Sequence, residues 1–333
     1  MRIYPVSPER AQSEGLREAA RVLRAGGLVA FPTETVYGLG ANALDAAAVQ
    51  RIFAAKGRPS YNPLIVHVAH ADAARALVRA WPEAAERLAR AFWPGPLTLV
   101  LPKQPQVPDA VTAGLPTVAL RVPAHPVALA LLESCALPLA APSANRFTQL
   151  SPTTAAHVAR SLGERVDVIL DGGPTSVGIE STVLDLSEGE PLLLRPGTLP
   201  LDRIESVVGP VRAPARAPAG EAPRRAPGML DRHYAPRAEL RLFESAAREA
   251  AAARAAQATA AGGVVGALLL HPLDAPVQHP LVMPPDPAEY ARRLYAALHT
   301  LDERGCSLIL VEWPPADAAW LGVRDRLQRA AAP

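Results

Sequence analysis

The chain has 333 residues and a net charge of +2, with 49% hydrophobic and 20% charged residues. The hydrophobic and charged fractions exclude a disordered protein, and the length indicates two folded domains of ordinary size. The small net charge does not demand nucleic acid as a partner. Cys135 and Cys306 have neither disulfide nor zinc spacing, and no apolar stretch suits a signal peptide or a bilayer. We therefore expect a cytoplasmic protein without a membrane partner.

Alternating hydrophobic patterns predict an α/β domain of about 205 residues with an open mixed sheet. Helices are expected at 8–25, 46–55, 72–81, 83–92, 126–135 and 153–162. Strands are expected at 28–33, 64–68, 97–101, 117–122 and 166–170, with another beginning near 137. The segments 181–186 and 191–195 are typical of a hairpin, and the polar segment after residue 33 is expected to be a loop.

A Pro/Arg-rich linker at 206–237 separates the first domain, 1–205, from a second domain at 238–333. Strands are expected in the second domain at 239–243, 264–270 and 307–313. An Ala/Arg-rich helix and helices at 287–304 and 317–331 alternate with these strands. The pattern predicts a small parallel, Rossmann-like three-layer α/β/α domain, although no G-x-G-x-x-G follows its first strand.

Lysine and asparagine are unusually scarce, which a GC-rich genome would explain. Only two of the 34 basic residues are lysines, and only three asparagines occur. A residue that persists against such a bias is a candidate for a chemical role. Lys56, Asn62 and Asn145 fall in polar loops and Asn42 lies just beyond one, whereas Lys103 precedes a Pro-rich loop and is expected to be an ordinary surface residue.

Polar side chains follow several predicted strands of the first domain, where the carboxyl ends of strands usually form one crevice. No Walker loop, zinc motif or nucleophile elbow is present. Taken singly, each residue has a structural explanation: Thr35 as a turn residue, Lys56-Gly57-Arg58 as a helix end, His67 as a core histidine. Taken together, the cations, amides and hydroxyls indicate a phosphate-bearing ligand. The set comprises Thr33, Glu34, Thr35, Tyr37, Lys56, Arg58, Asn62, His67, Arg121, Ser143, Asn145, Ser151, Ser181, Thr182 and Arg195.

The motifs FPTETVYGLG, K-x-R-P-x-x-N-P, WPGPLTLVL, LRVPAHP, APSAN, GIESTVLDL and LRPG resemble the YrdC-like family of threonylcarbamoyl-AMP synthases. The resemblance covers about 200 residues. Pro227 to Pro236, P-G-M-L-D-R-H-Y-A-P, is similar to the junction of the long, two-domain form, although Leu230-Asp231 departs from a stretch that is often more basic.

The resemblance implies an enzyme that makes threonylcarbamoyl-AMP and pyrophosphate from L-threonine, bicarbonate or CO2, and ATP. It places Thr35, His67, Arg121, the Ala141 backbone and Ser181 on the threonine side. The nucleotide side would hold Lys56, Arg58, Asn62, Thr117, Ser143, Asn145, Ser151, Arg195 and Tyr234. Lys56 and Arg58 are the expected catalytic residues, and Mg²⁺ would be held mainly by the phosphates, with no side-chain metal site.

The product would pass to the threonylcarbamoyl-transferase machinery that modifies adenosine 37 of tRNA, and weak RNA binding is a further expectation. The Pro-rich linker carrying Tyr234 is a candidate lid, since carbamates lose CO2 in water. Two alternatives stay open at this point. One is a non-catalytic RNA-binding module, recognisable by steep salt dependence. The other is an O-carbamoyl transfer enzyme, against which the absence of zinc-type cysteine pairs counts.

Overall fold

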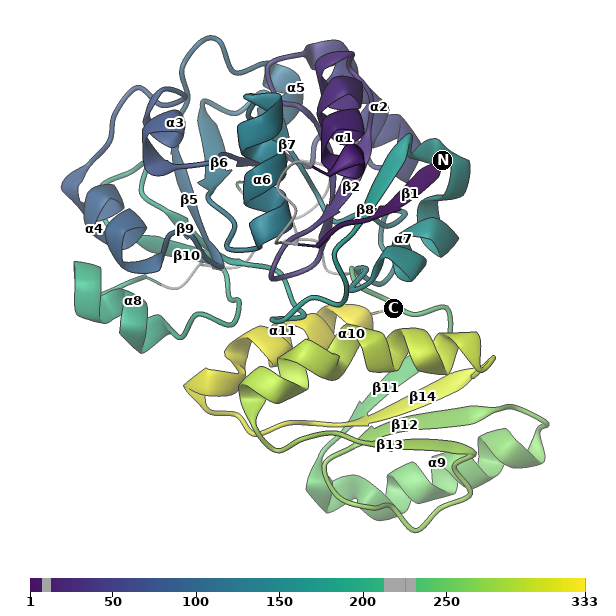
Figure 1. Ribbon diagram of the computed structural model, residues 1–333. Coiled ribbons are helices and arrows are strands. Elements are labelled where there is room, and N and C mark those ends of the chain that lie inside the picture. Colours follow the sequence, from purple (N-terminus) through teal and green to yellow (C-terminus); the bar gives the residue numbers. More distant parts are fainter. Residues whose placement is uncertain (8–12, 213–224, 226–231, 333) are drawn as a thin grey trace. The chain divides into compact units, whose positions relative to one another are not determined.

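The computed structural model describes residues 1–7, 13–212, 225 and 232–332, and the chain divides into two compact units (Figure 1). Unit 1 comprises Met1–Phe147, Ser151–Ser176 and Glu180–Met229. Unit 2 comprises Leu230–Pro333 and two short segments from the first part of the chain, Thr148–Leu150 and Val177–Ile179. Most of the predicted linker, at 213–224 and 226–231, lies outside the described residues.

Unit 1 is built on a ten-stranded mixed sheet. Its strand order is β1 (Arg2–Pro5), β8 (Val168–Asp171), β2 (Val29–Pro32), β3 (Tyr37–Asn42), β7 (Leu139–Ala140), β4 (Ile65–His67), β6 (Thr117–Arg121), β5 (Leu97–Pro102), β9 (Thr182–Asp185) and β10 (Leu192–Arg195). The sheet contains both parallel pairs, such as β4 with β6, and antiparallel pairs, such as β5 with β6. The predicted mixed sheet is confirmed, and β9 and β10 form the predicted antiparallel pair.

Helices cover both faces of this sheet, because successive strand residues point to opposite sides. Val29 and Phe31 of β2 pack with α1 and α6, which lie side by side, whereas Ala30 joins the core beneath α2 and α7. The helices are α1 (Glu14–Arg24), α2 (Ala46–Lys56), α3 (Ala71–Arg75), α4 (Glu83–Phe92), α5 (Asp109–Thr112), α6 (Pro126–Cys135), α7 (Ala155–Leu162) and α8 (Leu201–Val208).

Local sequence explains where these helices begin and end. Ser13 and Asp45 cap α1 and α2 by accepting bonds from main-chain N–H groups of the first turn. Gly57 ends α2 in the left-handed conformation, with φ 63°, which glycine adopts at little cost. The expected start of α1 at Pro8 lies outside the described residues, and its first described helical residue is Glu14.

Three local predictions were wrong. The expected loop after residue 33 contains β3, because the glycine-rich segment pairs with β2. The expected helix 72–81 ends at Arg75, because Leu77 O and Arg79 N instead bond to Gln104 and Pro102. Long-range hydrogen bonding therefore overrides the local sequence preference at both places. Lys103 is no ordinary surface residue: its side chain is 12% exposed and donates to Val107 O and Thr112 Oγ1.

Unit 2 contains a four-stranded, entirely parallel sheet in the order β11 (Glu239–Phe243), β14 (Leu308–Glu312), β12 (Val265–Leu269) and β13 (His279–Val282). Helix α9 (Arg248–Ala260) covers one face, and α10 (Pro287–Glu303) and α11 (Leu321–Ala330) cover the other (Figure 1). The predicted three-layer domain is confirmed. Strand β13 was not predicted, and the expected helix 317–331 begins with a 3₁₀ turn at Ala318–Trp320.

In the described part of the chain, no helix is both long enough and apolar enough to cross a membrane.

Candidate functional site

One face of the sheet in unit 1 carries a row of polar side chains. His67 of β4 pairs in register with Arg121 of β6, so both side chains lie on the same face. Thr98 of β5 pairs in register with Val183 of β9, so these two side chains lie on the same face. Ser181 precedes Val183 by two residues and lies on that face as well, with its Oγ 2.8 Å from Thr98 Oγ1. Strand register thus brings the predicted residues His67, Arg121 and Ser181 to neighbouring strands of one surface.

Arg121 is a buried cation of this row, with 3% of its surface exposed. Its Nη1 donates to Thr35 Oγ1 at 2.9 Å, and its Nε donates to Gly95 O at 3.2 Å. Thr35 is held in turn by Thr33, whose Oγ1 lies 2.8 Å from Thr35 Oγ1. The structure therefore brings Thr35 and Arg121 into direct contact, as expected for one binding subsite.

His67 is neutral at physiological pH. Burial, with the positive charge of Arg121 nearby, lowers the pKa of His67 to about 3. Its ring meets Phe31 edge-on with centroids 6.2 Å apart. Among the described residues, no hydrogen-bond partner is present for the buried Nδ1, so this nitrogen remains available to a ligand.

Ser181 and Arg195 form the far end of the row. Arg195 is 3% exposed, and its Nε and Nη2 donate to Ser181 O at 3.1 and 2.9 Å. The same Nη2 also donates to Ser181 Oγ at 3.1 Å. The structure thus joins a residue predicted for threonine to one predicted for ATP. Ala141, on the other side of the row, is fixed by its main-chain N–H, which donates to Ile65 O at 2.9 Å.

Lys56 anchors the loop that follows β7. Its Nζ donates to Ser143 O at 2.5 Å and also to Asn145 O, while Phe147 N donates back to Lys56 O at 2.9 Å. Burial and the nearby charge of Arg58 hold the pKa of Lys56 well below its usual range. The structure therefore joins Lys56, Ser143 and Asn145 through main-chain carbonyls rather than through their side chains.

Arg58 and Asn62 lie at the start of the segment that leads into β4. Arg58 donates from Nε to Asn62 O at 3.3 Å and from Nη2 to Pro63 O at 3.0 Å. Asn62 is 0% exposed, and neither its Oδ1 nor its Nδ2 has a partner within the described ranges. A fully buried amide with unused donor and acceptor atoms is expected where a ligand completes the hydrogen bonding.

The remaining nucleotide candidates are distributed over three places. Ser151 Oγ donates to Glu180 Oε1 at 2.5 Å in unit 1. Thr117 is the first residue of β6 and lies on the same face as Arg121. Arg121 follows four residues later, which corresponds to roughly 13 Å along the strand. Tyr234 belongs to unit 2, where its ring centroid lies 5.9 Å from that of Tyr295. Its predicted contact with ATP stays a prediction.

Two buried carboxylates lie near these cations: the sequence placed Glu34 in the polar set without giving it a role, and it did not single out Glu180. Glu34 Oε1 lies 2.6 Å from Arg121 Nη2, and Glu180 Oε1 accepts a hydrogen bond from the Ser151 hydroxyl. Both are flanked by assigned residues, Thr35 and Ser181, which is the signal that could have drawn attention to them. The role of an acidic residue among buried cations is easily overlooked, because sequence does not show which charges are paired.

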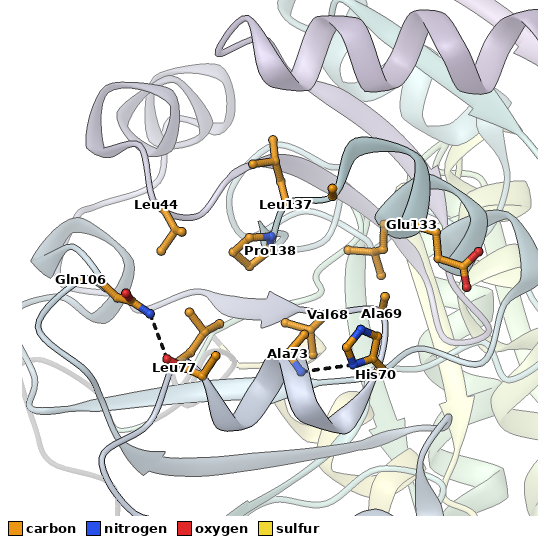
Figure 2. Close-up of a pocket in the computed structure, with 13 residues that line it drawn as sticks. Leu44, Val68, Ala69, His70, Ala73, Leu77, Gln106, Glu133, Leu137 and Pro138 are labelled. Atoms are coloured by element: carbon orange, nitrogen blue, oxygen red, sulfur yellow. Dashed lines mark hydrogen bonds between the residues drawn. The ribbon is translucent and has the colours of Figure 1, made fainter.

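An apolar cavity of about 520 Å³ also lies in unit 1, between α3, the end of α6 and the turn after β3 (Figure 2). Its lining includes Leu44, Val68, Leu77, Leu137 and Pro138 and none of the candidate residues. His70 at its edge is engaged in capping α3. An apolar lining of this kind does not suit the phosphate-bearing ligand that the sequence predicts.

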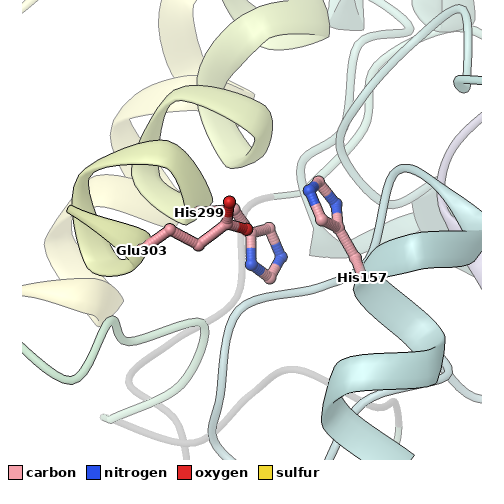
Figure 3. A group of neighbouring side chains, drawn as sticks. All are labelled: His157, His299 and Glu303. Atoms are coloured by element: carbon pink, nitrogen blue, oxygen red, sulfur yellow. The ribbon is translucent and has the colours of Figure 1, made fainter. Parts of the chain in front are cut away.

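Figure 3 draws three possible metal ligands, His157 of α7 and His299 and Glu303 of α10. His157 belongs to unit 1, where its Nδ1 lies 3.3 Å from both N and Oγ1 of Thr153. His299 and Glu303 lie one turn apart in unit 2. His157 therefore belongs to a different unit from His299 and Glu303.

In unit 2, the carboxyl ends of the parallel strands are occupied by the chain itself. Glu312, at the end of β14 and 0% exposed, accepts bonds from the main-chain N–H groups of Leu270 and His271. Arg248 Nη1 and Ser245 Oγ also donate to it, at 2.7 and 3.0 Å. This end of the sheet is a common ligand site in open α/β sheets, but here the Glu312 carboxylate accepts the hydrogen bonds of these groups.

The fold and the buried cationic row define an α/β protein with buried polar side chains along one face of a mixed sheet. Comparison with known families agrees: residues 21–197 match the Sua5/YciO/YrdC family, whose model is described as "Telomere recombination". Residues 199–332 match the "Threonylcarbamoyl-AMP synthase, C-terminal domain" family. The chain therefore belongs to the Sua5/YciO/YrdC family, in its two-domain form.

Relatives of known name match over nearly the whole chain. The threonylcarbamoyl-AMP synthase of Pyrococcus abyssi is 47% identical over 97% of this chain and 95% of its own length. The enzyme of the same name from Bacillus subtilis is 43% identical over 95% and 92%. The crystal structure of P. abyssi Sua5 complexed with L-threonine matches with a TM-score of 0.91 and 44% identity, covering 99% of this chain and 98% of that one.

Proposed function

We propose that this chain is an L-threonylcarbamoyladenylate synthase, a nucleotidyltransferase that makes threonylcarbamoyl-AMP and pyrophosphate from L-threonine, bicarbonate or CO2, and ATP. The observation that carries the proposal is the buried cationic row in unit 1, with Arg121 against Thr35 and Arg195 against Ser181. Relatives named for this activity, and one solved with L-threonine, support it.

The threonine end of the pocket is assigned to Arg121, Thr35, His67, Ser181 and the Ala141 backbone. A guanidinium binds a carboxylate with charge-assisted hydrogen bonds, which suits Arg121 to the threonine carboxylate. Neutral His67 adds a ring nitrogen without adding charge. Binding in this pocket would hold the threonine amine close to CO2, so that their reaction to a carbamate is favoured by proximity.

The nucleotide end is assigned to Lys56, Arg58, Asn62, Ser143 and Arg195, with further contacts from Thr117, Asn145, Ser151 and Tyr234. A carbamate oxygen attacks the α-phosphorus of ATP, the bond to the β-phosphate oxygen breaks, and pyrophosphate leaves. No covalent enzyme nucleophile is required. The positive charges of Arg58 and Arg195 stabilise the negative charge that develops on the phosphates, and phosphate beside Lys56 would favour the charged form of its amine.

Mg²⁺ is proposed to arrive with ATP, held mainly by phosphate oxygens, where it would neutralise phosphate charge. In the described part of unit 1, the two buried carboxylates nearest the cations already accept hydrogen bonds, Glu34 from Ala124 N and Glu180 from Ser151 Oγ. That donor set suits a phosphate-borne cation better than one held by protein carboxylates. The product is proposed to pass to the machinery that modifies tRNA.

The test is pyrophosphate release from ATP by the full chain, with and without L-threonine and bicarbonate. Release is expected to require both. Arg58→Ala and Lys56→Ala are expected to lower turnover strongly, because each removes a positive charge from the phosphate end, whereas Arg21→Ala removes an exposed charge paired with Glu18 and serves as the control. Release that ignores threonine would refute the proposed reaction, and normal turnover of Arg58→Ala would refute the phosphate assignment.

A further inference from the structure

Glu34 is a buried carboxylate for which the proposed reaction has no use. It follows β2 between Thr33 and Thr35 and is 6% exposed. Its Oε1 lies 2.6 Å from Nη2 of Arg121, as an ion pair rather than an aligned hydrogen bond. Its Oε2 accepts a hydrogen bond from Ala124 N at 3.0 Å.

The contacts of Arg121 show what Glu34 adds. The guanidinium is held on Nε by Gly95 O and on Nη1 by Thr35 Oγ1, both neutral acceptors. Glu34 is the only negatively charged group paired with Arg121 among the described residues. A buried guanidinium without a counter-charge is costly, and its side chain would be free to reorient. Glu34 therefore supplies both the compensating charge and a third point of attachment.

A carboxylate is needed here rather than an amide, because both of its oxygens face donors. One oxygen faces the Arg121 guanidinium and the other faces the Ala124 N–H. A glutamine has only one oxygen, so its NH2 group would face a second donor whichever way the amide is turned. Glu34 thereby ties the loop after β2 to the segment after β6, the strand that carries Arg121.

We propose that Glu34 is a positioning residue that fixes the Arg121 guanidinium in the orientation that receives the carboxylate of L-threonine. The inference rests on the proposed function, since it assigns threonine to Arg121. Glu34 itself does not touch the substrate. It acts through Arg121, so its loss affects recognition of the threonine carboxylate and leaves the nucleotide end unchanged.

The experiment is steady-state pyrophosphate release by the full-length Glu34→Gln variant, with L-threonine and ATP varied in turn. The KM for threonine is expected to rise about ten-fold or more, the scale of a lost charge-assisted contact, while the KM for ATP stays within about two-fold. The preference for L-threonine over L-threoninamide, which lacks the carboxylate charge, is expected to narrow by a similar factor. Glu18→Gln, which removes an exposed ion pair with Arg21, is the matched control and is expected to resemble the wild type.

A purely structural role predicts a different pattern. A lower melting temperature with the threonine-to-threoninamide preference unchanged would overturn the proposal. If Glu34→Gln does not fold, Glu34→Asp keeps the charge but is shorter by one methylene, and it is expected to raise the KM for threonine alone. An unchanged threonine KM in that variant would also overturn the proposal. Failure of the proposed function would be seen separately, as threonine-independent release by the wild type.

Discussion

Lys56 places a compact ammonium group between two main-chain carbonyls, those of Ser143 and Asn145. In a chain where nearly every other cation is arginine, this geometry gives a physical reason for lysine, because a small, three-donor head fits a gap that a planar guanidinium would not. Lys103 shows the same pattern at a smaller scale, since it donates to Val107 O and Thr112 Oγ1. Lys103 also pairs with the Asp109 carboxylate, so both surviving lysines bind oxygen atoms of the loops around them.

His67 predicts a pH dependence of stability. Its folded pKa, about 3, is far below the value of about 6.5 expected in the unfolded chain, so between these values the unfolded state binds the additional proton. The contribution of neutral His67 to the free energy of unfolding is therefore fully present above about pH 6.5, and it decreases as the pH is lowered toward 3. The slope from this group is at most about 1.4 kcal/mol per pH unit.

Urea unfolding between pH 7 and pH 4.5 measures this effect. His67→Asn is expected to lose less stability than the wild type over that interval, although its stability at pH 7 is lower. Equal slopes for His67→Asn and the wild type would contradict the assignment of His67 as a buried neutral residue.

At the scale of elements, the β9–β10 pair carries Ser181 and Arg195 to the same point, and Gly197 lets the chain pass close behind them. A Cβ on Gly197 would lie 2.4 Å from Thr182 N and 2.7 Å from Ser181 C, both backbone atoms that cannot turn aside. Gly197 N also donates to Thr182 Oγ1 at 3.0 Å. The absence of a side chain at this position is therefore a condition for the approach of Arg195 to Ser181.

Gly197→Ala is expected to lower the free energy of unfolding by about 1–3 kcal/mol, because the added methyl group forces the backbone to shift. Threonine-dependent pyrophosphate release should fall in the same variant. Gly189→Ala is the control, because Gly189 has φ 87° and no atom lies within 4 Å of an added Cβ. This variant is expected to lose roughly 1 kcal/mol of stability through backbone strain, without crowding the site. If both variants behaved alike, crowding behind Ser181 would not be the cause.

At the scale of the whole molecule, the chain does not complete unit 1 before it contributes to unit 2. Thr148–Leu150 and Val177–Ile179 belong to unit 2, and each is followed directly by residues of the candidate site, Ser151 and Glu180. Within unit 2, Ala235 N donates to Thr148 O at 2.9 Å. Residues adjoining the site therefore depend on a unit whose main part comes from the far end of the chain.

A chain shortened to residues 1–212 is expected to be less stable than the full chain. It loses the partners of Leu150 and Ile179, which are 3% and 0% exposed, and exposing two such side chains costs on the order of 3–6 kcal/mol. Thermal unfolding followed by circular dichroism, with pyrophosphate release measured in parallel, tests the prediction. A shortened chain with an unchanged melting temperature and full activity would contradict it, and would also remove the Tyr234 linker from consideration as a lid.

The sequence by itself determined the α/β class, the helices Glu83–Phe92 and Pro126–Cys135, and the order of the polar motifs, because helix periodicity, caps and buried strands are local properties. It did not determine β3, the early end of α3, or the pairing of Glu34 with Arg121. These depend on residues that lie far apart along the chain and meet only when strands pair. Tertiary structure alone decided which charges of the candidate site face one another, since register and burial set the partner of each buried group.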